Sequence, residues 1–421
     1  MTIKLLNGLD FPISADDGGY LDIESAQFLE QIKTAIKNSK IKAESFIGGS
    51  FAKKTMIKSD NYDIDIFIRF DKKYKEDEFP ALLEKIIKNT KTKYDKLHGS
   101  RDYLQVLRSG KLTFEIIPVT KISRPKEALN TTDLSYFHVN YVKNKLKNKK
   151  LLKEIRLAKR FFKANRVYGA ESYISGFSGY AVECLIIHYK SFEKMIKSFL
   201  TDKKILIDTE GFYTKDNLLM EINESKTHSP IVLVDPTFKE RNVLAALSQE
   251  TFDKLKLKIK GFFSKPSLDY FEIEDVDEMQ LKSEASRQKA EYARVILSTK
   301  KQAGDIAGTK MKKFSGYLLR EIARYFDVIR NEFEYKLGDN ASLYIIARNK
   351  EEIIERGPPL KKEMQKHIDA FKKMHKGAFE KDGRLYVKAK IDFSLKQFIE
   401  QFAKKYSSKI KQMGVSGVRI D

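Results

Sequence analysis

Alternation of apolar and polar residues predicts a small β-sheet near the start of the chain. One strand is expected at 63–68, where acidic and aliphatic residues alternate, and a hairpin at 103–107 and 112–119, closed by a Ser-Gly turn. Apolar residues at helical spacing predict helices at 25–36 and near 79–90 that back this sheet. The chain is therefore expected to begin with a small mixed sheet that has helices on one side.

The pattern turns helical from residue 140. One helix face carries four apolar residues: Leu151, Ile155, Ala158 and Phe162. Another face carries three basic residues: Arg156, Lys159 and Lys163. Solvent exposure is the simplest account of Arg156 and Lys163. Further on we expect one long buried helix at 179–200, a strand at 231–234 and a short helix at 243–246.

A domain boundary is expected after residue 263, where a Lys-Pro-Ser linker precedes the acidic run 272–278. The elements that follow are expected to be a strand, a helix and two strands: 293–297, 314–328, 333–337 and 342–346. Such a β-α-β-β series can pack as a small split sheet.

The stretch 48–55, Gly-Gly-Ser-Phe-Ala-Lys-Lys-Thr, is a candidate phosphate site. It follows the apolar pair Phe46-Ile47 and predicts a strand, a tight glycine turn and a short helix. Such a turn directs backbone N–H groups and a helix N-terminus at an anion. Gly49 and Ser50 stand at its centre.

Asp63 and Asp65 share one face of their expected strand, because side chains alternate with a period of two. Two carboxylates held that close repel each other unless a cation lies between them. Oxygen ligands beside a phosphate site favour Mg²⁺ or Mn²⁺ over zinc. The alternative without a metal is a Gly-Gly loop followed by an edge strand with an acidic outer face.

Glu115 is the only acidic residue in the second arm of the expected hairpin. Phe114, Ile116 and Ile117 surround it in sequence, so its carboxylate would be half-buried and costly without a partner. A shared metal would be that partner, and a site that bridges two metals requires such a third carboxylate.

Gly49-Ser50, the Asp63 and Asp65 pair and Glu115 together resemble the pattern of the polymerase-β-like nucleotidyltransferase superfamily. Further segments narrow the resemblance to the archaeal-type (class I) CCA-adding enzymes, which are tRNA nucleotidyltransferases: Phe137-His138, Lys159 to Asn165, Tyr168 to Glu171, Gly176 to Tyr180, Asp235-Pro236 and Arg241 to Val243. The resemblance is specific from about residue 47 to about residue 263. Beyond that it is looser and rests on spacing and on Arg356-Gly357-Pro358.

This resemblance implies a multidomain α+β fold. Residues 1–139 would form a polymerase-β-like nucleotidyltransferase head with a mixed sheet, 140–270 a mostly helical nucleotide-binding neck, and 271–421 an α+β body and tail that binds tRNA. The implied activity is template-independent addition of C, C and A to the 3′ end of tRNA from CTP and ATP.

The resemblance also implies roles for single residues. Two Mg²⁺ ions, with Mn²⁺ as a substitute, would be held by the three acids: Asp63, Asp65 and Glu115. The triphosphate would contact the turn at Gly49 and five side chains: Ser50, Lys53, His138, Lys159 and Tyr168. Arg241 would help to select the base, whereas Asp235 is expected to shape its turn. Without the resemblance, His138 reads as a loop histidine.

One departure from the family pattern is Glu115 itself. The family usually has Asp at this third acidic position, and Glu is one methylene longer. The difference bears on metal geometry and therefore on rate.

Charge supports a polyanionic partner. Lys and Arg number 80 against 58 for Asp and Glu, a net charge of +22, which favours a nucleic acid or an anionic membrane surface. A lysine-rich composition without functional meaning is the alternative. Residues 360–421 hold 16 Lys and Arg against 7 acids, or +9, with interleaved aromatic residues that suit RNA. Two of these, Phe398 and Phe402, fit a helix core equally well.

The single cysteine, Cys184, excludes an intrachain disulfide and a cysteine-cluster zinc site. The first 20 residues lack the features of a secretory signal, and no stretch reaches the roughly 20 apolar residues of a membrane span. We therefore expect a cytoplasmic protein with no membrane partner. No protein partner is predicted, and a homodimer is left open.

Two other functions share part of this pattern. Another polymerase-β-like nucleotidyltransferase, such as a poly(A) polymerase or an oligoadenylate or cyclic-dinucleotide synthase, would have the Gly-Ser and acidic motifs but not the ordered set from His138 to Arg241. An RNA-binding protein that has lost catalysis is the other alternative, and only Glu115 favours it.

Overall fold

The computed structural model describes residues 4–97, 99, 101–147, 149–214, 217–222, 227–300, 304–336 and 338–421. The chain divides into two compact units, Met1–Glu274 and Asp275–Asp421. The expected boundary at 270/271 lies close to this division. None of the helices in the described ranges combines the length and apolar character that crossing a membrane requires.

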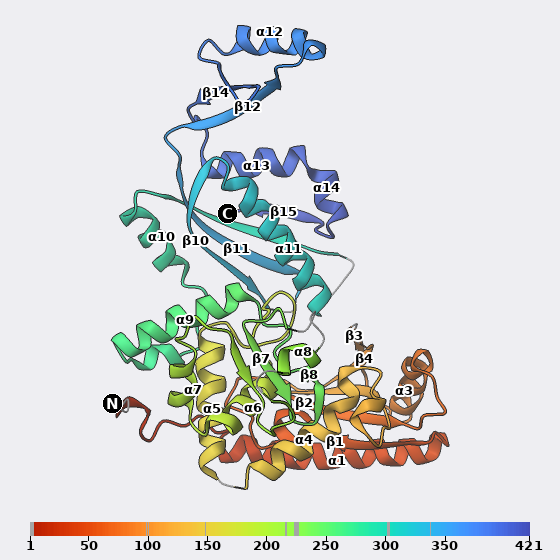
Figure 1. Ribbon diagram of the computed structural model, residues 1–421. Coiled ribbons are helices and arrows are strands. Elements are labelled where there is room, and N and C mark those ends of the chain that lie inside the picture. The colour runs from red at the N-terminus through yellow and green to blue at the C-terminus, as the bar shows by residue number, and fades with distance from the viewer. Residues whose placement is uncertain are drawn as a thin grey trace. The chain divides into compact units, whose positions relative to one another are not determined.

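A five-stranded mixed sheet organises the first part of unit 1 (Figure 1). In spatial order its strands are β1 (Ala43–Ile47), β2 (Tyr62–Phe70), β5 (Leu112–Thr120), β4 (Tyr103–Ser109) and β3 (Asp95–Leu97). Strands β2 and β5 pair in parallel, and the other neighbours are antiparallel. The expected hairpin is confirmed as β4 and β5.

Two helices cover one face of this sheet, α1 (Ala15–Ser39) and α3 (Phe79–Lys88). Helix α1 begins where the Ser14 hydroxyl accepts a hydrogen bond from the Asp17 N–H. Its apolar side packs against Ile64 and Ile66, which point to this face from β2. Because side chains alternate along a strand, Asp63 and Asp65 lie on the opposite face.

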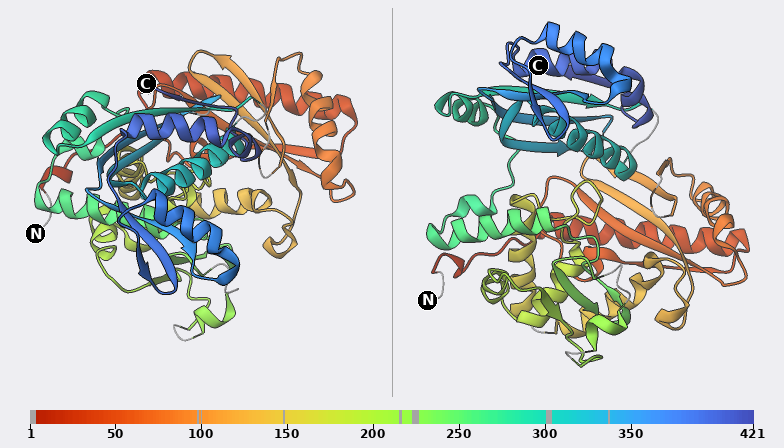
Figure 2. Two further views of the ribbon diagram at one scale, coloured as in Figure 1. Left: turned by 90° about the horizontal axis from the view of Figure 1, so that it is seen from above. Right: turned by 45° about the horizontal axis from the view of Figure 1, so that its top comes forward.

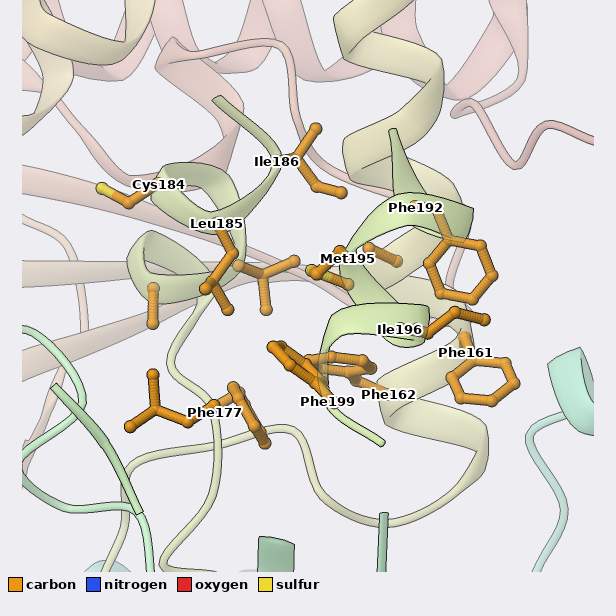
Figure 3. Packing of buried hydrophobic residues seen from close by; sticks show 14 of the residues in the cluster. Phe161, Phe162, Phe177, Cys184, Leu185, Ile186, Phe192, Met195, Ile196 and Phe199 are labelled. Atoms are coloured by element: carbon orange, nitrogen blue, oxygen red, sulfur yellow. The ribbon is translucent and has the colours of Figure 1, made fainter. Parts of the chain in front are cut away.

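The rest of unit 1 is built around a second hydrophobic core, rich in phenylalanine (Figure 3). Five helices contribute to it: α4 (Ser135–Lys145), α5 (Lys149–Ala164), α6 (Gly179–Tyr189), α7 (Phe192–Ser198) and α9 (Gln249–Ser264). Beside it lie short helix α8 (Leu218–Glu221) and a three-stranded sheet in the order β6 (Ile205–Ile207), β7 (Ile231–Asp235), β8 (Phe238–Asn242). Figure 3 shows Phe162, Phe177 and Phe199 directed toward one another in this core.

Two expectations for this region are wrong. The helix expected at 179–200 breaks at Lys190, whose φ of 61° is left-handed, so that α6 and α7 are separate helices. The helix expected at 243–246 is a turn that follows β8. The Asn242 side chain accepts hydrogen bonds from the N–H groups of Leu233 and Leu244, and this local bonding replaces a helical start.

Unit 2 contains an antiparallel four-stranded sheet in the order β10 (Phe326–Tyr335), β11 (Asn340–Asn349), β9 (Glu291–Ser298), β15 (Gly417–Ile420). Helices α11 (Gly304–Ile322) and α13 (Leu395–Lys405) pack on one face, as the turned views in Figure 2 show, and α10 (Glu278–Arg287) packs on the other. A smaller sheet, β12 (Ile353–Pro359), β14 (Arg384–Ala389) and β13 (Phe379–Lys381), carries α12 (Gln365–Met374).

The expected helix at 314–328 is wrong at both ends, since α11 begins at Gly304 and ends at Ile322. Residues 326–328 belong instead to β10, which makes a long ladder with β11. Leu337, the last residue of one expected strand, lies outside the described residues. Phe398 and Phe402 both pack into the core of unit 2, so the structure favours their core role.

Candidate active site

The glycine turn after β1 is held against the acidic face of the sheet. The Gly48 N–H donates to the Asp65 carbonyl oxygen at 2.8 Å, and Gly49 has a φ of +58°. A Cβ atom at Gly49 would lie 1.6 Å from Asp65 Oδ2. Only glycine can therefore hold the turn this close to the carboxylate.

The three acids of the expected site lie on neighbouring strands. Strand pairing sets Asp65 directly opposite Glu115, and Asp63 lies two residues earlier on β2. Burial, followed by the charge of Asp63, raises the pKa of Asp65 to about 6 against the lowering effect of Lys53. Burial and the charges of both aspartates raise the pKa of Glu115 to about 7, although Gln105 donates a hydrogen bond to it. The carboxylates thus repel one another on a partly buried face.

Asp63, Asp65 and Glu115 offer carboxylate oxygens and no sulfur or imidazole, and such oxygen ligands suit a hard divalent cation. Within the described residues, no three acidic, histidine or cysteine side chains are gathered closely enough to hold a metal ion. The fit therefore rests on the Asp65 and Glu115 register pair. Burial and mutual repulsion raise the pKa of both groups, and a cation between them would oppose that rise.

We expect the metal-free protein to lose stability as the pH rises from about 4 to about 7. The pKa values of Asp65 and Glu115 are raised in the fold, so the stability that their protons contribute is present at low pH and lost as each group ionises. A shift of about two units corresponds to about 3 kcal/mol for one such group. The melting temperature of wild type and Glu115→Gln, measured in EDTA from pH 4 to 8, checks this. The variant should show a flatter profile, and parallel profiles would contradict the assigned shift.

A buried ionic cluster lies beside the turn. Glu183 of α6 accepts hydrogen bonds from Lys53 Nζ at 2.6 Å, Lys159 Nζ at 2.8 Å and Thr55 Oγ1 at 2.5 Å. Burial alone would raise the pKa of Glu183, but the Lys159 and Lys53 charges outweigh it and hold the pKa at about 2. The structure thus brings together two predicted phosphate ligands.

Sequence reasoning missed Glu183 and Thr55. One signal was available for Glu183: it is the only acidic residue of the apolar helix α6, and a carboxylate in such a helix requires a partner. Thr55 ended the predicted phosphate stretch but received no role of its own. Its N–H donates to the Ser50 carbonyl at 3.0 Å, which closes the turn.

A second polar cluster surrounds Asp235. His138 Nε2 lies 3.0 Å from Asp235 Oδ2, to which Arg241 Nη1 also donates at 2.7 Å. Tyr180 donates to the other oxygen of Asp235, and its ring stacks on His138 with centroids 3.9 Å apart. Burial opposes ionisation of Asp235, but His138 and Arg241 outweigh it and keep its pKa well below the usual value.

One expectation about this cluster is wrong, and another is confirmed but incomplete. His138 is buried in α4 rather than placed in a loop. Asp235 does shape its turn, because its Oδ1 accepts from the N–H and the hydroxyl of Thr237. It also binds His138 and Arg241, which sequence reasoning did not foresee.

Tyr168 lies beside Lys163, one of the two basic residues of α5 for which we expected solvent exposure. A Cβ atom at Gly179 would meet the Tyr168 hydroxyl at 2.6 Å, so the glycine lets the ring approach α6. Lys163 Nζ lies 5.3 Å from the Tyr168 ring centroid. Burial raises the pKa of Asp63, and the charge of Lys163 opposes part of that rise. Arg156 instead forms a two-point ion pair with Asp10. Both bases are partly buried, and their expected full solvent exposure is therefore wrong.

Comparison with known proteins matches two family models to unit 1. A nucleotidyltransferase domain model matches residues 29–133, and a model of the tRNA nucleotidyltransferase second domain matches residues 153–272. The first match contains Asp63, Asp65 and Glu115, and the second contains Lys159 and Glu183.

Curated relatives include several archaeal CCA-adding enzymes. That of Nanoarchaeum equitans is 44% identical over 209 residues, which cover 49% of this chain and 52% of the relative. That of Methanocaldococcus jannaschii is 27% identical over 395 residues, covering 90% and 85%. That of Thermoplasma acidophilum is 32% identical over 259 residues, covering 60% and 55%. The chain thus aligns with about half the length of the first and third relatives and with most of the second.

Proposed function

We propose that the chain belongs with the archaeal CCA-adding enzymes that it resembles, and that it adds C, C and A to the 3′ end of tRNA. The nucleotides come from CTP and ATP, without a nucleic-acid template. The observation that carries the proposal is the pairing of Asp65 with Glu115 beside a glycine turn that touches Asp65.

Asp63, Asp65 and Glu115 are the residues that hold two Mg²⁺ ions in this proposal, and Mn²⁺ could replace them. The chemistry such ions supply when bound is a lower pKa for the tRNA 3′ hydroxyl and neutralisation of the leaving pyrophosphate. Glu115 is the acid assigned to the primer side. Its pKa is raised to about 7, and a cation beside it would lower that pKa and favour the ionised carboxylate.

The residues around the turn bind and orient the nucleotide. Backbone N–H groups at Gly49 and Ser50 face the phosphates, and the ammonium groups of Lys53 and Lys159 supply positive charge beside them. Tyr168 and His138 complete the triphosphate contacts. This set holds the α-phosphate for in-line attack, which is most of what a protein contributes to phosphoryl transfer.

Arg241 selects the incoming base in this proposal. Its guanidinium is fixed by Asp235, which also holds His138, so one buried carboxylate orients both groups. A planar fork of donors held in one direction can distinguish bases by the acceptors on their edges.

A radioactive incorporation assay tests the activity. With tRNA that ends before its CCA, CTP alone should give two additions, and ATP alone should give none. With tRNA that ends in CC, ATP should give one addition, and UTP or GTP should give none. Runs of A from ATP alone would instead indicate a poly(A) or oligoadenylate activity.

The basic surface of unit 2 is the proposed contact for tRNA. Three exposed lysines on α12, Lys366, Lys372 and Lys373, lie in the segment 360–421 that carries the charge of +9. Much of the remaining segment builds the core through α13, α14 (Ser407–Gln412) and β15. Substitution on α12 therefore removes charge without removing core.

Changing these three lysines together to alanine should weaken tRNA binding and reduce the slope of log affinity against log salt by up to about 3. Filter binding at several salt concentrations measures both, and CTP affinity should stay unchanged. The matched control replaces three exposed lysines on α1 and α3, behind the head sheet: Lys37, Lys85 and Lys88. Equal slopes for the α12 variant and wild type would contradict this RNA contact.

A further inference from the structure

Glu183 is a fully buried carboxylate that receives hydrogen bonds from three groups. Its exposed fraction is 0%, and its partners Lys159 and Lys53 are 2% and 8% exposed. Lys53 and Thr55 follow the glycine turn in the head, whereas Lys159 lies on α5 of the neck. The Glu183 carboxylate therefore links the residues after the glycine turn to helices α5 and α6, which belong to the phenylalanine-rich core.

The two lysines use their donors differently. An ammonium has three N–H donors. Lys159 directs them to Glu183 Oε1, to Thr55 Oγ1 at 2.9 Å and to the Thr55 carbonyl at 3.2 Å, so its donors are all used. Lys53 donates to Glu183 Oε2, and within the described parts of the chain its ammonium makes no other hydrogen bond to protein. Two N–H donors of Lys53 therefore have no hydrogen-bond acceptor among the described residues, and the ammonium lies 5.8 Å from the centroid of the Tyr180 ring.

The charge balance of the cluster also favours an anion. Counted alone, the two lysines and Glu183 carry a net charge of +1, and the charges of both lysines also act on Asp65 of the neighbouring acidic face. Two ammonium groups on the same carboxylate repel each other, and removing the buried acid would leave them without compensation. Without it we expect one lysine to leave the site.

Of the two lysines in the cluster, Lys53 has the larger effect on the pKa of Asp65 on the acidic face. Among the positive charges that act on Asp65, that of Lys53 is the strongest and that of Lys159 is weaker. Lys53 comes directly after helix α2 (Gly49–Ala52), whose first residues form the glycine turn. The N–H donors of Lys53 that are not bonded to Glu183 therefore lie close to the glycine turn.

We propose that Glu183 is a positioning residue for the triphosphate, an inference that rests on the proposed function. Glu183 holds Lys53 so that two of its N–H donors remain for the phosphates. Lys159 fixes the positions of Glu183 and Thr55 by hydrogen bonds and adds positive charge to the site. Discrimination between a nucleoside triphosphate and the corresponding monophosphate is then a property of this cluster.

The test compares Glu183→Gln with wild type by equilibrium binding of CTP and CMP in Mg²⁺. An amide offers a single oxygen and presents an NH₂ group to an ammonium, so it cannot hold both lysines. CTP affinity should fall about tenfold or more, while CMP affinity should change less than about twofold. The matched control is Asp133→Asn in the head, another buried acid (2% exposed) that is paired with Arg101. It should lower the melting temperature but keep the ratio of CTP to CMP affinity.

A second variant covers the case in which Glu183→Gln does not fold. Lys53→Met leaves the Glu183 and Lys159 pair intact and neutral, and it should also lose the preference for CTP over CMP. A preference retained in Lys53→Met, or in folded Glu183→Gln, overturns the proposal, as does an equal loss for CMP and CTP. Because these measurements involve no tRNA, a wild-type protein that binds CTP but adds nothing to tRNA would refute the proposed function and leave this inference standing.

Discussion

Replacing Asp65 by asparagine is expected to reduce nucleotide addition by about 10³-fold or more. An amide supplies no anionic oxygen, and Asp65 is the acid that both faces Glu115 and touches the glycine turn. The change removes a group whose pKa is raised to about 6, so folding should not suffer at neutral pH. Rates of CTP addition at saturating tRNA measure the effect.

The control for this variant is that its melting temperature is no lower than that of wild type and that its tRNA affinity is unchanged. An addition rate within a few fold of wild type would contradict the assignment of Asp65 as a metal ligand. If Asp65→Asn does not fold, Asp63→Asn is tested in its place. Asp63 lies at the more exposed end of the same strand face.

The second large effect concerns Glu115. Glu115→Gln should remove most activity, by about 10²-fold or more, because the neutral amide cannot share a cation with Asp65. Glu115→Asp should keep substantial activity, because it restores the acid that the family usually has at this position. The pair of variants separates charge from length, since Gln keeps the length and Asp keeps the charge.

Single-turnover addition rates at saturating Mg²⁺ are the measurement for this pair. On the neighbouring strand β4, Gln105 lies opposite Glu115. The variant Gln105→Ala serves as a control for the strand register. Equal activity of the Gln and Asp variants would show that Glu115 is not the third acid.

The head and its acids could be predicted because their signals are local. Alternation over 63–68 fixed which face carries Asp63 and Asp65, and Glu115 stood out as the sole acid of its strand. The parallel pairing of β2 with β5 was not visible, since strand order depends on contacts between residues about 50 positions apart.

The buried clusters could not be predicted in the same way. Lys53 and Glu183 are 130 positions apart, and His138 and Asp235 are 97 apart. On α5, Lys159 and Lys163 fall on the polar side by periodicity, yet Lys159 is buried and Lys163 is partly buried. Thr55, which follows the glycine turn, packs against Lys159 there. A helical pattern shows which face is apolar but not which polar side chains tertiary contacts will bury.

The errors in helix ends have local causes that compete with periodicity. Lys190 adopts a left-handed conformation that ends α6, and the Asn242 side chain bonds to nearby N–H groups in place of a helical turn. In unit 2, residues 326–328 join a ladder with β11, whose pairing outweighs the helical spacing.

The most direct test of the proposed activity is to sequence the 3′ ends of tRNA after reaction. Wild-type protein and Mg²⁺ are incubated with tRNA that ends before its CCA, with all four nucleoside triphosphates present, and Asp65→Asn serves as the inactive control. The proposed function predicts ends that read CCA and extend no further. Ends that remain unextended, or that carry runs of A or U, would contradict it.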